Sequence, residues 1–201
     1  MAKGSLLVIS GPAGSGKGTV NAHLIRGGDF AFSVSATTRA PRPGEQNGVN
    51  YHFISREDFI FRIESGGMLE HTEYCGNFYG TPKKEALEAL ESGKNLILEI
   101  EVDGACQVKQ KYPEAILIML LPPSFSVQES RLRGRGTESE DKILARLART
   151  REELREIDHY DYVVYNYDGK DREAAERIRA IVAAEQSSLR KNPDVMEKYF
   201  E

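Results

Sequence analysis

A glycine-rich stretch near the N-terminus has the residue types of a phosphate-binding loop. It reads Gly-Pro-Ala-Gly-Ser-Gly-Lys-Gly-Thr and follows the apolar run Leu6-Leu7-Val8-Ile9. Glycines permit a tight turn in which backbone N–H groups converge on phosphate oxygens, and a lysine adds positive charge near the β- and γ-phosphates. The usual pattern has Ser or Thr directly after the lysine, and a metal-binding hydroxyl is unassigned here because that position is glycine. The sequence therefore predicts nucleotide binding by Gly11, Pro12, Ala13, Gly14, Ser15, Gly16, Lys17, Gly18 and Thr19.

Two arginines three positions apart, Arg39 and Arg42, lie in a segment that Pro41 and Pro43 stiffen. The stiff backbone holds the two guanidinium groups near one another. Like charges at short range repel unless an anion lies between them, and a planar guanidinium matches phosphate oxygens with two parallel hydrogen bonds. An isolated pair of this kind is typical of a solvated basic loop. Beside a phosphate-binding loop, it indicates a second anion site.

A second basic segment, residues 131–151, contains seven lysines and arginines against three acidic residues, in a chain whose formal net charge is −4. Arg135 lies in its Gly-rich first part, and Arg146 lies on the helix expected after it. Phosphoryl transfer needs positive charge around the migrating group and the exclusion of water. We therefore expect a basic lid that closes over bound nucleotide, with some of its arginines simply solvated.

The elements that must position these residues alternate between strands and helices. Apolar runs predict strands at residues 6–9, at 96–98 with an alternation that continues to 102, at 115–121 and at 161–165. Helix signals predict one helix after the glycine-rich loop that ends at Gly27-Gly28, and three more that start at Thr81-Pro82 (an N-cap and first-turn proline), at Thr137 with Glu140 (a capping box) and at Asp171. This alternation predicts an α/β fold with a parallel sheet core flanked by helices.

Two segments interrupt this rhythm. Residues 30–80 contain short aromatic and β-branched pieces and one short helix beginning at Ser55, so they predict an inserted α+β lobe. Residues 133–141 are rich in Gly, Arg and acids and contain no apolar side chain, which predicts a solvated, mobile loop.

Composition and charge limit the classes of function. With 201 residues, 40% of them hydrophobic, the chain is expected to bury a core without disulfides. The net charge of −4 gives no overall attraction to nucleic acid or to an anionic membrane. Its two cysteines form no CxxC, its four histidines lack metal-ligand spacing, and its N-terminus lacks the apolar length of a signal peptide. We expect a cytoplasmic protein with small-molecule substrates and neither a nucleic-acid nor a membrane partner. The oligomeric state is unknown from sequence.

Several motifs together resemble the guanylate kinases and run in the family's order over almost the whole chain. They are Ser10-Gly11-Pro12-Ala13-Gly14-Ser15-Gly16-Lys17, Phe32-Ser33-Val34-Ser35, Thr37-Thr38-Arg39-Ala40-Pro41-Arg42-Pro43-Gly44-Glu45, Gly48-Val49-Asn50-Tyr51-His52-Phe53, Gly76-Asn77-Phe78-Tyr79-Gly80-Thr81 and Arg131-Leu132-Arg133-Gly134-Arg135-Gly136-Thr137. The Thr-Thr-Arg-x-Pro-Arg segment and the Arg-Gly-Thr lid are more specific than the glycine-rich loop.

The resemblance implies transfer of the ATP γ-phosphoryl group to GMP, giving ADP and GDP, with Mg²⁺. It implies a P-loop core at residues 1–34, 82–130 and 149–201, a GMP-binding lobe at 35–81 and an Arg-rich lid at 131–148. By motif position, the resemblance assigns binding of the GMP phosphate to Arg39, Arg42, Tyr51 and Tyr79. It assigns recognition of the guanine base to Ser35, Glu70, Thr81 and Glu101. The resemblance places Lys17, Arg42, Arg135 and Arg146 around the migrating phosphoryl group. It assigns ATP binding to the glycine-rich loop together with Arg131, Arg135 and Asn166.

The chemistry of the base supports the role of Glu70. Guanine offers N1–H and N2–H₂ as adjacent donors that a carboxylate accepts, whereas adenine presents a lone pair at N1 and is repelled. Polar pairing of this kind discriminates between bases by orders of magnitude. From the sequence alone, Glu70 also fits an ordinary surface acid.

Three positions depart from the family pattern: Gly18 stands where Ser is usual, Glu101 replaces Asp, and Asn166-Tyr167-Asp168 differs from Asn-Asp-Asp. Gly-Lys-Gly-Thr is common in adenylate kinases, so AMP phosphorylation is one alternative. A non-catalytic guanylate-kinase-like binding module is another, although such modules typically lose the loop and lid charges. Glu99, at the end of an apolar strand, is either an acid that orients metal-bound water or a solvated strand end.

Overall fold

Five short apolar runs form one parallel sheet at the centre of the fold. The computed structural model, which describes residues 3–134, 136 and 139–200, orders these strands as β2 (Phe30–Phe32), β7 (Asn95–Leu98), β1 (Leu6–Ser10), β8 (Ile116–Leu121) and β9 (Tyr162–Tyr165). Leu7 of the central strand lies opposite Ile97 on one side and Ile116 on the other. A strand with parallel neighbours on both sides and helices above and below is buried on both faces, and β1 is buried throughout and apolar from Leu6 to Ile9.

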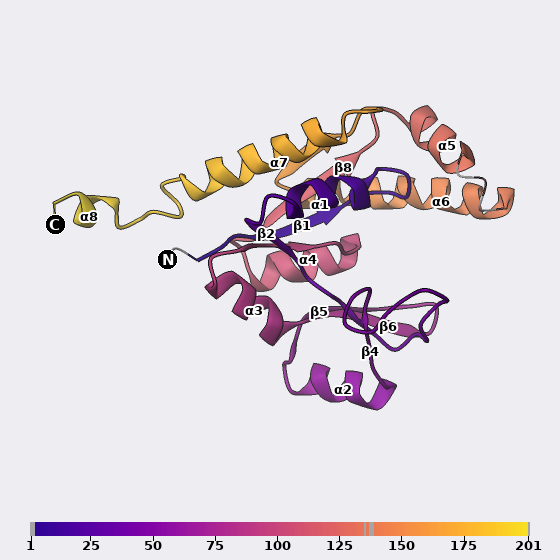
Figure 1. Ribbon diagram of the computed structural model, residues 1–201, viewed down its shortest axis with the longest axis horizontal. Coiled ribbons are helices and arrows are strands. Elements are labelled where there is room, and N and C mark those ends of the chain that lie inside the picture. Colours follow the sequence, from indigo (N-terminus) through magenta and orange to yellow (C-terminus); the bar gives the residue numbers. More distant parts are fainter. Residues whose placement is uncertain (1–2, 135, 137–138, 201) are drawn as a thin grey trace.

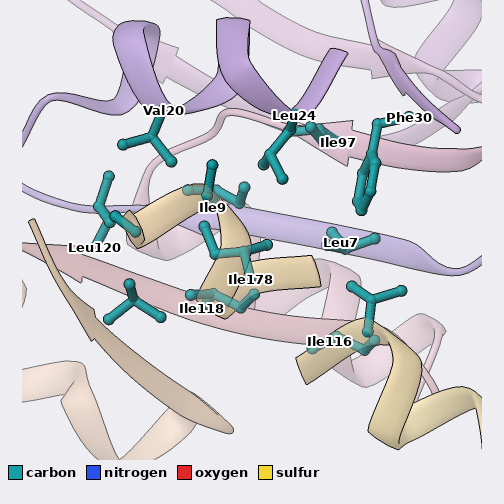
Figure 2. Packing of buried hydrophobic residues seen from close by; sticks show 14 residues of the cluster. Leu7, Ile9, Val20, Leu24, Phe30, Ile97, Ile116, Ile118, Leu120 and Ile178 are labelled. Atoms are coloured by element: carbon teal, nitrogen blue, oxygen red, sulfur yellow. The ribbon is translucent and has the colours of Figure 1, made fainter. Parts of the chain in front are cut away.

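Alternate residues of β1 face two different helix layers. Leu7 and Ile9 pack against α1 (Lys17–Ile25) and α7 (Asp171–Gln186), as Figure 2 shows for the cluster around Ile178. Leu6 and Val8 pack on the opposite face against α3 (Lys83–Glu91) and α4 (Val102–Lys111). Figure 1 shows the two helix layers on either side of the central strands. The carboxyl end of β1 is thereby fixed where the glycine-rich loop begins.

A second sheet forms the inserted lobe. Its strand order is β4 (His52–Phe53), β3 (Ala36–Thr37), β6 (Asn77–Pro82) and β5 (Met68–Tyr74), with β3 antiparallel to β6 and parallel to β4. The helix α2 (Arg56–Glu64) covers it through Phe59, which is fully buried with Ala36 and Met68. The helix expected to begin at Ser55 begins at Arg56, and Ser55 is its N-cap, accepting a hydrogen bond from the Asp58 N–H.

The remaining elements extend from the core. The helices α5 (Phe125–Gly134) and α6 (Glu140–Glu153) pack on one another through Leu132, Ile143 and Leu147, and a 3₁₀ helix, η1 (Leu154–His159), leads into β9. A short C-terminal helix, α8 (Val195–Phe200), lies at the far end of the molecule from α5 in Figure 1.

Several sequence expectations about the elements were wrong. Residues 30–32 belong to the parallel core sheet as β2, and only the chain after them turns into the lobe. The strand expected to reach residue 102 ends at Leu98, and Val102 starts a helix that the sequence analysis did not predict. The expected loop at 133–141 is shorter, because α5 continues to Gly134 and α6 begins at Glu140. The helices α5 and α8 were also not predicted.

The N-cap expected at Thr81 is displaced by one residue. Pro82 is the N-cap of α3 and ends β6, and the Thr81 hydroxyl is used elsewhere. For α6 the N-cap is Ser139, and Thr137, the expected cap, lies outside the described residues. Cys75 and Cys106 are free thiols. None of the helices within the described ranges combines the length and the apolar character that a membrane crossing requires.

Candidate nucleotide-binding site

The glycine-rich loop is a tight turn between β1 and α1. Gly14 and Gly16 have φ of 87° and 89°, in the left-handed region that glycine adopts without strain, and the Ser15 N–H donates to the Pro12 carbonyl at 3.1 Å. Lys17, the first residue of α1, donates from Nζ to the Gly11 carbonyl across the loop. The loop therefore joins a helix N-terminus, with its partial positive charge, to a lysine ammonium.

Three side chains from distant parts of the chain bind three consecutive carbonyls of this loop. Gln128 of α5 donates from Nε2 to Ala13 O at 2.9 Å, and Arg131 of the same helix donates from Nη1 to Gly14 O at 3.1 Å. Asn166, directly after β9, donates from Nδ2 to Ser15 O at 3.0 Å. Holding these carbonyls outward leaves the backbone N–H groups of the loop to face an anion.

A concavity of about 470 Å³ lies beside the loop. It is lined by Gly14, Gly16, Arg131, Gly134, Asn166, Tyr167, Asp168, Gly169 and Asp171. The Arg131 side chain forms part of the wall of this concavity. Its Nη2 atom also donates to Asn166 O at 2.8 Å and to Asp168 Oδ1 at 2.6 Å. Asn166 is 1% exposed and its Nδ2 is shared between Ser15 O and Asp171 Oδ1, so this residue shapes the loop and the concavity from beneath.

In the lobe, Arg39 already has an anionic partner. Both of its terminal nitrogens donate to the Glu45 carboxylate, at 2.8 and 3.0 Å, and the Arg42 backbone N–H donates to Glu45 Oε2 at 2.7 Å. The bond from Arg39 lowers the pKa of Glu45 to about 2. Glu45, from the same segment, therefore balances the charge of Arg39. The second anion site at Arg39 and Arg42 stays a prediction. The Arg42 side chain is exposed.

Aromatic rings surround the Arg39 guanidinium. Tyr51 and Phe53 lie with ring centroids 5.3 and 5.6 Å from Arg39 Cζ, and the Tyr79 ring lies 6.1 Å from that of Tyr51. Burial raises the pKa of the Tyr51 hydroxyl, so it stays a hydrogen-bond donor. The structure therefore brings together three of the four residues assigned to the acceptor phosphate: a fixed guanidinium and two phenol groups.

Glu70 is a buried carboxylate that is hydrogen-bonded by Thr81. Its side chain is 2% exposed on β5, and Oε1 accepts from Thr81 Oγ1 on β6 at 2.8 Å. Burial raises its pKa, which the Thr81 bonds and Lys111 only partly offset. This burial excludes the alternative that Glu70 is an ordinary surface acid. The other oxygen, Oε2, faces Gly104 of α4, where an added Cβ would lie only 2.8 Å away.

The helix α4 holds the lobe strand that carries Glu70. Gln107 donates from Nε2 to His71 O at 2.9 Å and accepts from the His71 N–H at 3.3 Å, so its amide pairs with β5 as a neighbouring strand would. Lys111 donates from Nζ to Leu69 O at 3.0 Å. These bonds fix the position of the strand that carries Glu70 relative to α4. Sequence reasoning missed them, because their partners lie 36 or 42 residues away.

Two acids follow β7 at the carboxyl edge of the sheet. Glu99 accepts from Asn21 Nδ2 of α1 at 2.8 Å, so it lies against the helix that starts in the glycine-rich loop. Glu101 is the N-cap of α4 and pairs with Arg149 of α6. Among the described residues, no group of three His, Cys, Asp or Glu side chains is arranged to hold a metal ion alone.

Arg149 joins the lobe to α6. Its Cζ lies 4.9 Å from the ring centroid of Tyr74, at the end of β5, and its Nε donates to Glu153 at 3.2 Å. Burial alone would lower the pKa of Arg149, but Glu101 and Glu153 raise it. Of the other predicted residues, Arg146 is exposed on α6, Ser35 is half-buried before β3, and Arg135 lies outside the described residues.

Comparisons with known proteins agree on one family. Residues 3–185 match the family model described as guanylate kinase. A guanylate kinase of Halalkalibacterium halodurans is 49% identical over 200 residues, which cover 99% of this chain and 96% of that relative. One of Clostridium tetani is 46% identical over 185 residues, which cover 92% and 88%. The crystal structure of guanylate kinase from Anaplasma phagocytophilum gives a TM-score of 0.74 at 34% identity, covering 94% of this chain and 89% of that chain.

Proposed function

This chain belongs to the guanylate kinase family and is an ATP:GMP phosphotransferase, and we propose how its own residues bind the two nucleotides and transfer the phosphoryl group. The alternative of an adenylate kinase rested on Gly18. It finds no support, because the relatives that match nearly the whole chain are guanylate kinases. The alternative of a non-catalytic module finds none for the same reason.

ATP binds at the glycine-rich loop, with its phosphates on the loop N–H groups and Lys17 and its base toward the concavity bounded by Arg131 and Asn166. The support is the triple fixation of the loop carbonyls and the continuity of this concavity with Gly14 and Gly16. Asn166 acts in this proposal by shaping the loop, since its side chain is 1% exposed.

GMP binds in the lobe formed by residues 35–81. Arg39, Arg42, Tyr51 and Tyr79 hold its phosphate, and Glu70 with Thr81 and Ser35 reads guanine. Thr81 donates to one oxygen of Glu70, which leaves the other for the N1–H and N2–H₂ donors of guanine. Glu101 remains a candidate for the base, although it pairs with Arg149 here.

Phosphoryl transfer then needs alignment and charge more than covalent help from the protein. The migrating group carries negative charge over three equatorial oxygens, and cations around it stabilise the transition state. We assign this role to Lys17, Arg42, Arg146 and Arg135, the last within a lid at residues 131–148. No general base is required, because the GMP phosphate is itself the nucleophile.

Mg²⁺ fits the donors beside the loop. This ion takes oxygen ligands and usually keeps several waters, binding through one or two carboxylates plus substrate phosphates. Glu99 is the carboxylate held against α1 by Asn21, and we propose that it holds the ion through water. When bound, the ion supplies positive charge to the β- and γ-phosphates.

The observation that carries the base assignment is the burial of an ionisable carboxylate at Glu70, for which Thr81 is the hydrogen-bond donor among the described residues. A coupled assay with GMP and with AMP tests it on the wild-type protein and on Glu70→Gln. We expect a strong preference for GMP in the wild type. In the variant we expect the KM for GMP to rise by about tenfold or more, since a hydrogen bond to a charged group is worth about 1.5–3 kcal/mol, and the gap to AMP to narrow.

Glu73→Gln is the matched control, because Glu73 is an exposed acid three residues along the same strand. It should leave the selectivity unchanged. Equal wild-type rates with GMP and AMP would contradict the proposal, and unchanged selectivity in Glu70→Gln would remove this residue from the base site.

A further inference from the structure

A buried polar path connects the glycine-rich loop to α6. Gln128 Nε2 donates to Ala13 O at 2.9 Å and to Thr150 Oγ1 at 2.7 Å, and Thr150 Oγ1 donates in turn to Arg146 O at 3.1 Å. Gln128 is 1% exposed and Thr150 is 3% exposed. Both protons of the Gln128 amide and the hydroxyl proton of Thr150 are therefore used inside the protein. The path begins in the ATP loop and ends on the backbone of the residue to which we assign a charge-stabilising role.

The surroundings of this path are apolar. Leu132 of α5 and Ile143 and Leu147 of α6 are buried together, and Ala13 of the loop packs against them. Apolar side chains alone would hold these three segments together, and a leucine and a valine would fill the space of Gln128 and Thr150 without the cost of burying polar groups. Apolar contacts are non-directional, whereas hydrogen bonds fix both distance and angle. What the polar pair adds is register between α6 and the loop.

We propose that Gln128 and Thr150 are positioning residues for phosphoryl transfer. They set α6 against the glycine-rich loop so that Arg146 meets the phosphoryl group that the loop presents. The inference rests on the proposed function, because it takes Arg146 to act on the migrating group. Gln128 has a second effect through the same amide, since it turns the Ala13 carbonyl outward as part of the loop fixation. We expect this effect in the KM for ATP, so that kcat reports the action through Arg146.

The test is a double-mutant cycle on the full chain between Gln128→Leu and Arg146→Ala, with kcat, the KM for each nucleotide and the thermal midpoint measured for all four proteins. Misplacement of a catalytic group by about 1 Å costs up to about a hundredfold. We expect Gln128→Leu to lower kcat by about tenfold or more with the KM for GMP nearly unchanged. In the Arg146→Ala background, the same substitution should lower kcat by less than about twofold.

Thr150→Val and Thr150→Ser keep the proposal testable if Gln128→Leu does not fold. Valine keeps the β-branched shape and removes the hydroxyl, whereas serine keeps the hydroxyl. We expect Val to reproduce the loss of kcat and Ser to restore most of it. Ser130→Ala, at an exposed position of α5, is the matched control and should change neither kcat nor KM.

The outcomes separate this inference from the proposed function. If Arg146→Ala leaves kcat unchanged, the assigned role of Arg146 fails and the inference fails with it. If Arg146→Ala lowers kcat but Gln128→Leu lowers it by the same factor in both backgrounds, the proposed function stands and the positioning role is overturned. An unchanged kcat in Gln128→Leu, or Ser and Val variants that behave alike, would also overturn it.

Discussion

At the scale of single residues, Glu70 must be ionised to accept hydrogen bonds from guanine, yet its burial favours the neutral acid. Burial raises its pKa above the ordinary value of 4.5. The carboxyl group therefore takes up a proton at a pH where an exposed glutamate stays charged, and a protonated Glu70 no longer offers an acceptor to both guanine donors. We expect the KM for GMP to rise as the pH falls through this raised pKa, while the KM for ATP changes little.

The pH dependence of stability without nucleotide has the opposite sign. Because the folded pKa lies above the unfolded one, the ionised form destabilises the folded state, and the free energy of unfolding should increase as the pH falls through the raised pKa toward 4.5. Glu70→Gln should remove the pH dependence of the KM for GMP, measured in pH profiles, and the pH dependence of the free energy of unfolding, measured by urea titrations. A wild-type profile that persists in this variant would assign the titration to another group.

Local structure around the candidate site was predictable from sequence where the signal lies in neighbouring residues. The glycine-rich turn after the first strand and the helix start near Ser55 depend on residue type and on near neighbours, whereas Glu70 was chosen through the family resemblance and its burial was not predicted. The partners of these residues were not predictable, because they come from far along the chain: Gln128 binds a loop carbonyl 115 residues away and Asn166 one 151 residues away. Glu45 was quoted only as part of a motif, although its carboxylate pairs with Arg39.

At the scale of elements, α4 was missed because its sequence is a poor helix. Gly104 lies in its first turns and lowers its intrinsic propensity by about 1 kcal/mol relative to alanine, and residues 99–102 alternate like a strand. The structure supplies the reason for the glycine. An added Cβ would lie 2.8 Å from Glu70 Oε2 and 3.2 Å from Ile100 Cδ1, so glycine lets the backbone of α4 lie close to the Glu70 carboxylate.

Gly104→Ala is expected to impair GMP binding although alanine favours helix. The methyl group must displace the Glu70 carboxylate, so the KM for GMP should rise severalfold, while the KM for ATP is retained. Steady-state kinetics with each substrate varied in turn is the measurement. A KM for GMP equal to that of the wild type would mean that Oε2 moves aside at no cost to guanine.

Gly18→Ser is the contrasting substitution in a helix. No atom of the residues that the structure describes lies within 4 Å of an added Cβ at Gly18, and the residue is exposed in the first turn of α1. We expect stability to increase by about 0.5 kcal/mol from helix propensity, measured by urea unfolding without nucleotide. A hydroxyl directly after the lysine is also a metal ligand in P-loop proteins, so the Mg²⁺ concentration at half-maximal activity should fall. If stability rises and that concentration does not, the hydroxyl fails to reach the ion.

At the scale of the whole molecule, the lobe and α6 are joined by Arg149. Its guanidinium lies over Tyr74, and it pairs with Glu101 at the start of α4 and with Glu153 on its own helix. The side on which GMP is expected is thereby connected to the helix that carries Arg146. The parallel core sheet was predictable from the alternation of strands and helices. The contact made by Arg149 was not, because it depends on how the lobe lies against α6.

Tyr74→Ala should weaken this connection without unfolding the protein, since Tyr74 is 48% exposed. A cation–π contact of this kind is worth about 0.5–1 kcal/mol, so we expect the KM for GMP to rise about two- to fivefold with the thermal midpoint nearly constant. Phe61→Ala, at an exposed aromatic position on α2, is the control for loss of a surface ring in the same lobe. An equal effect of both substitutions would show that the contact with Arg149 is not the cause.

The outward-turned carbonyls of the glycine-rich loop have a kinetic consequence. A receptor whose shape is set during folding loses little conformational entropy when its ligand arrives. Capture of the triphosphate should therefore be a one-step encounter, with a rate constant that is linear in ligand concentration and sensitive to ionic strength, instead of one that levels off at a rearrangement. Stopped-flow fluorescence with a labelled nucleotide would display that linearity. A substitution that removes the hydrogen bond from Gln128, Arg131 or Asn166 to the loop should make the observed rate constant level off at high nucleotide concentration.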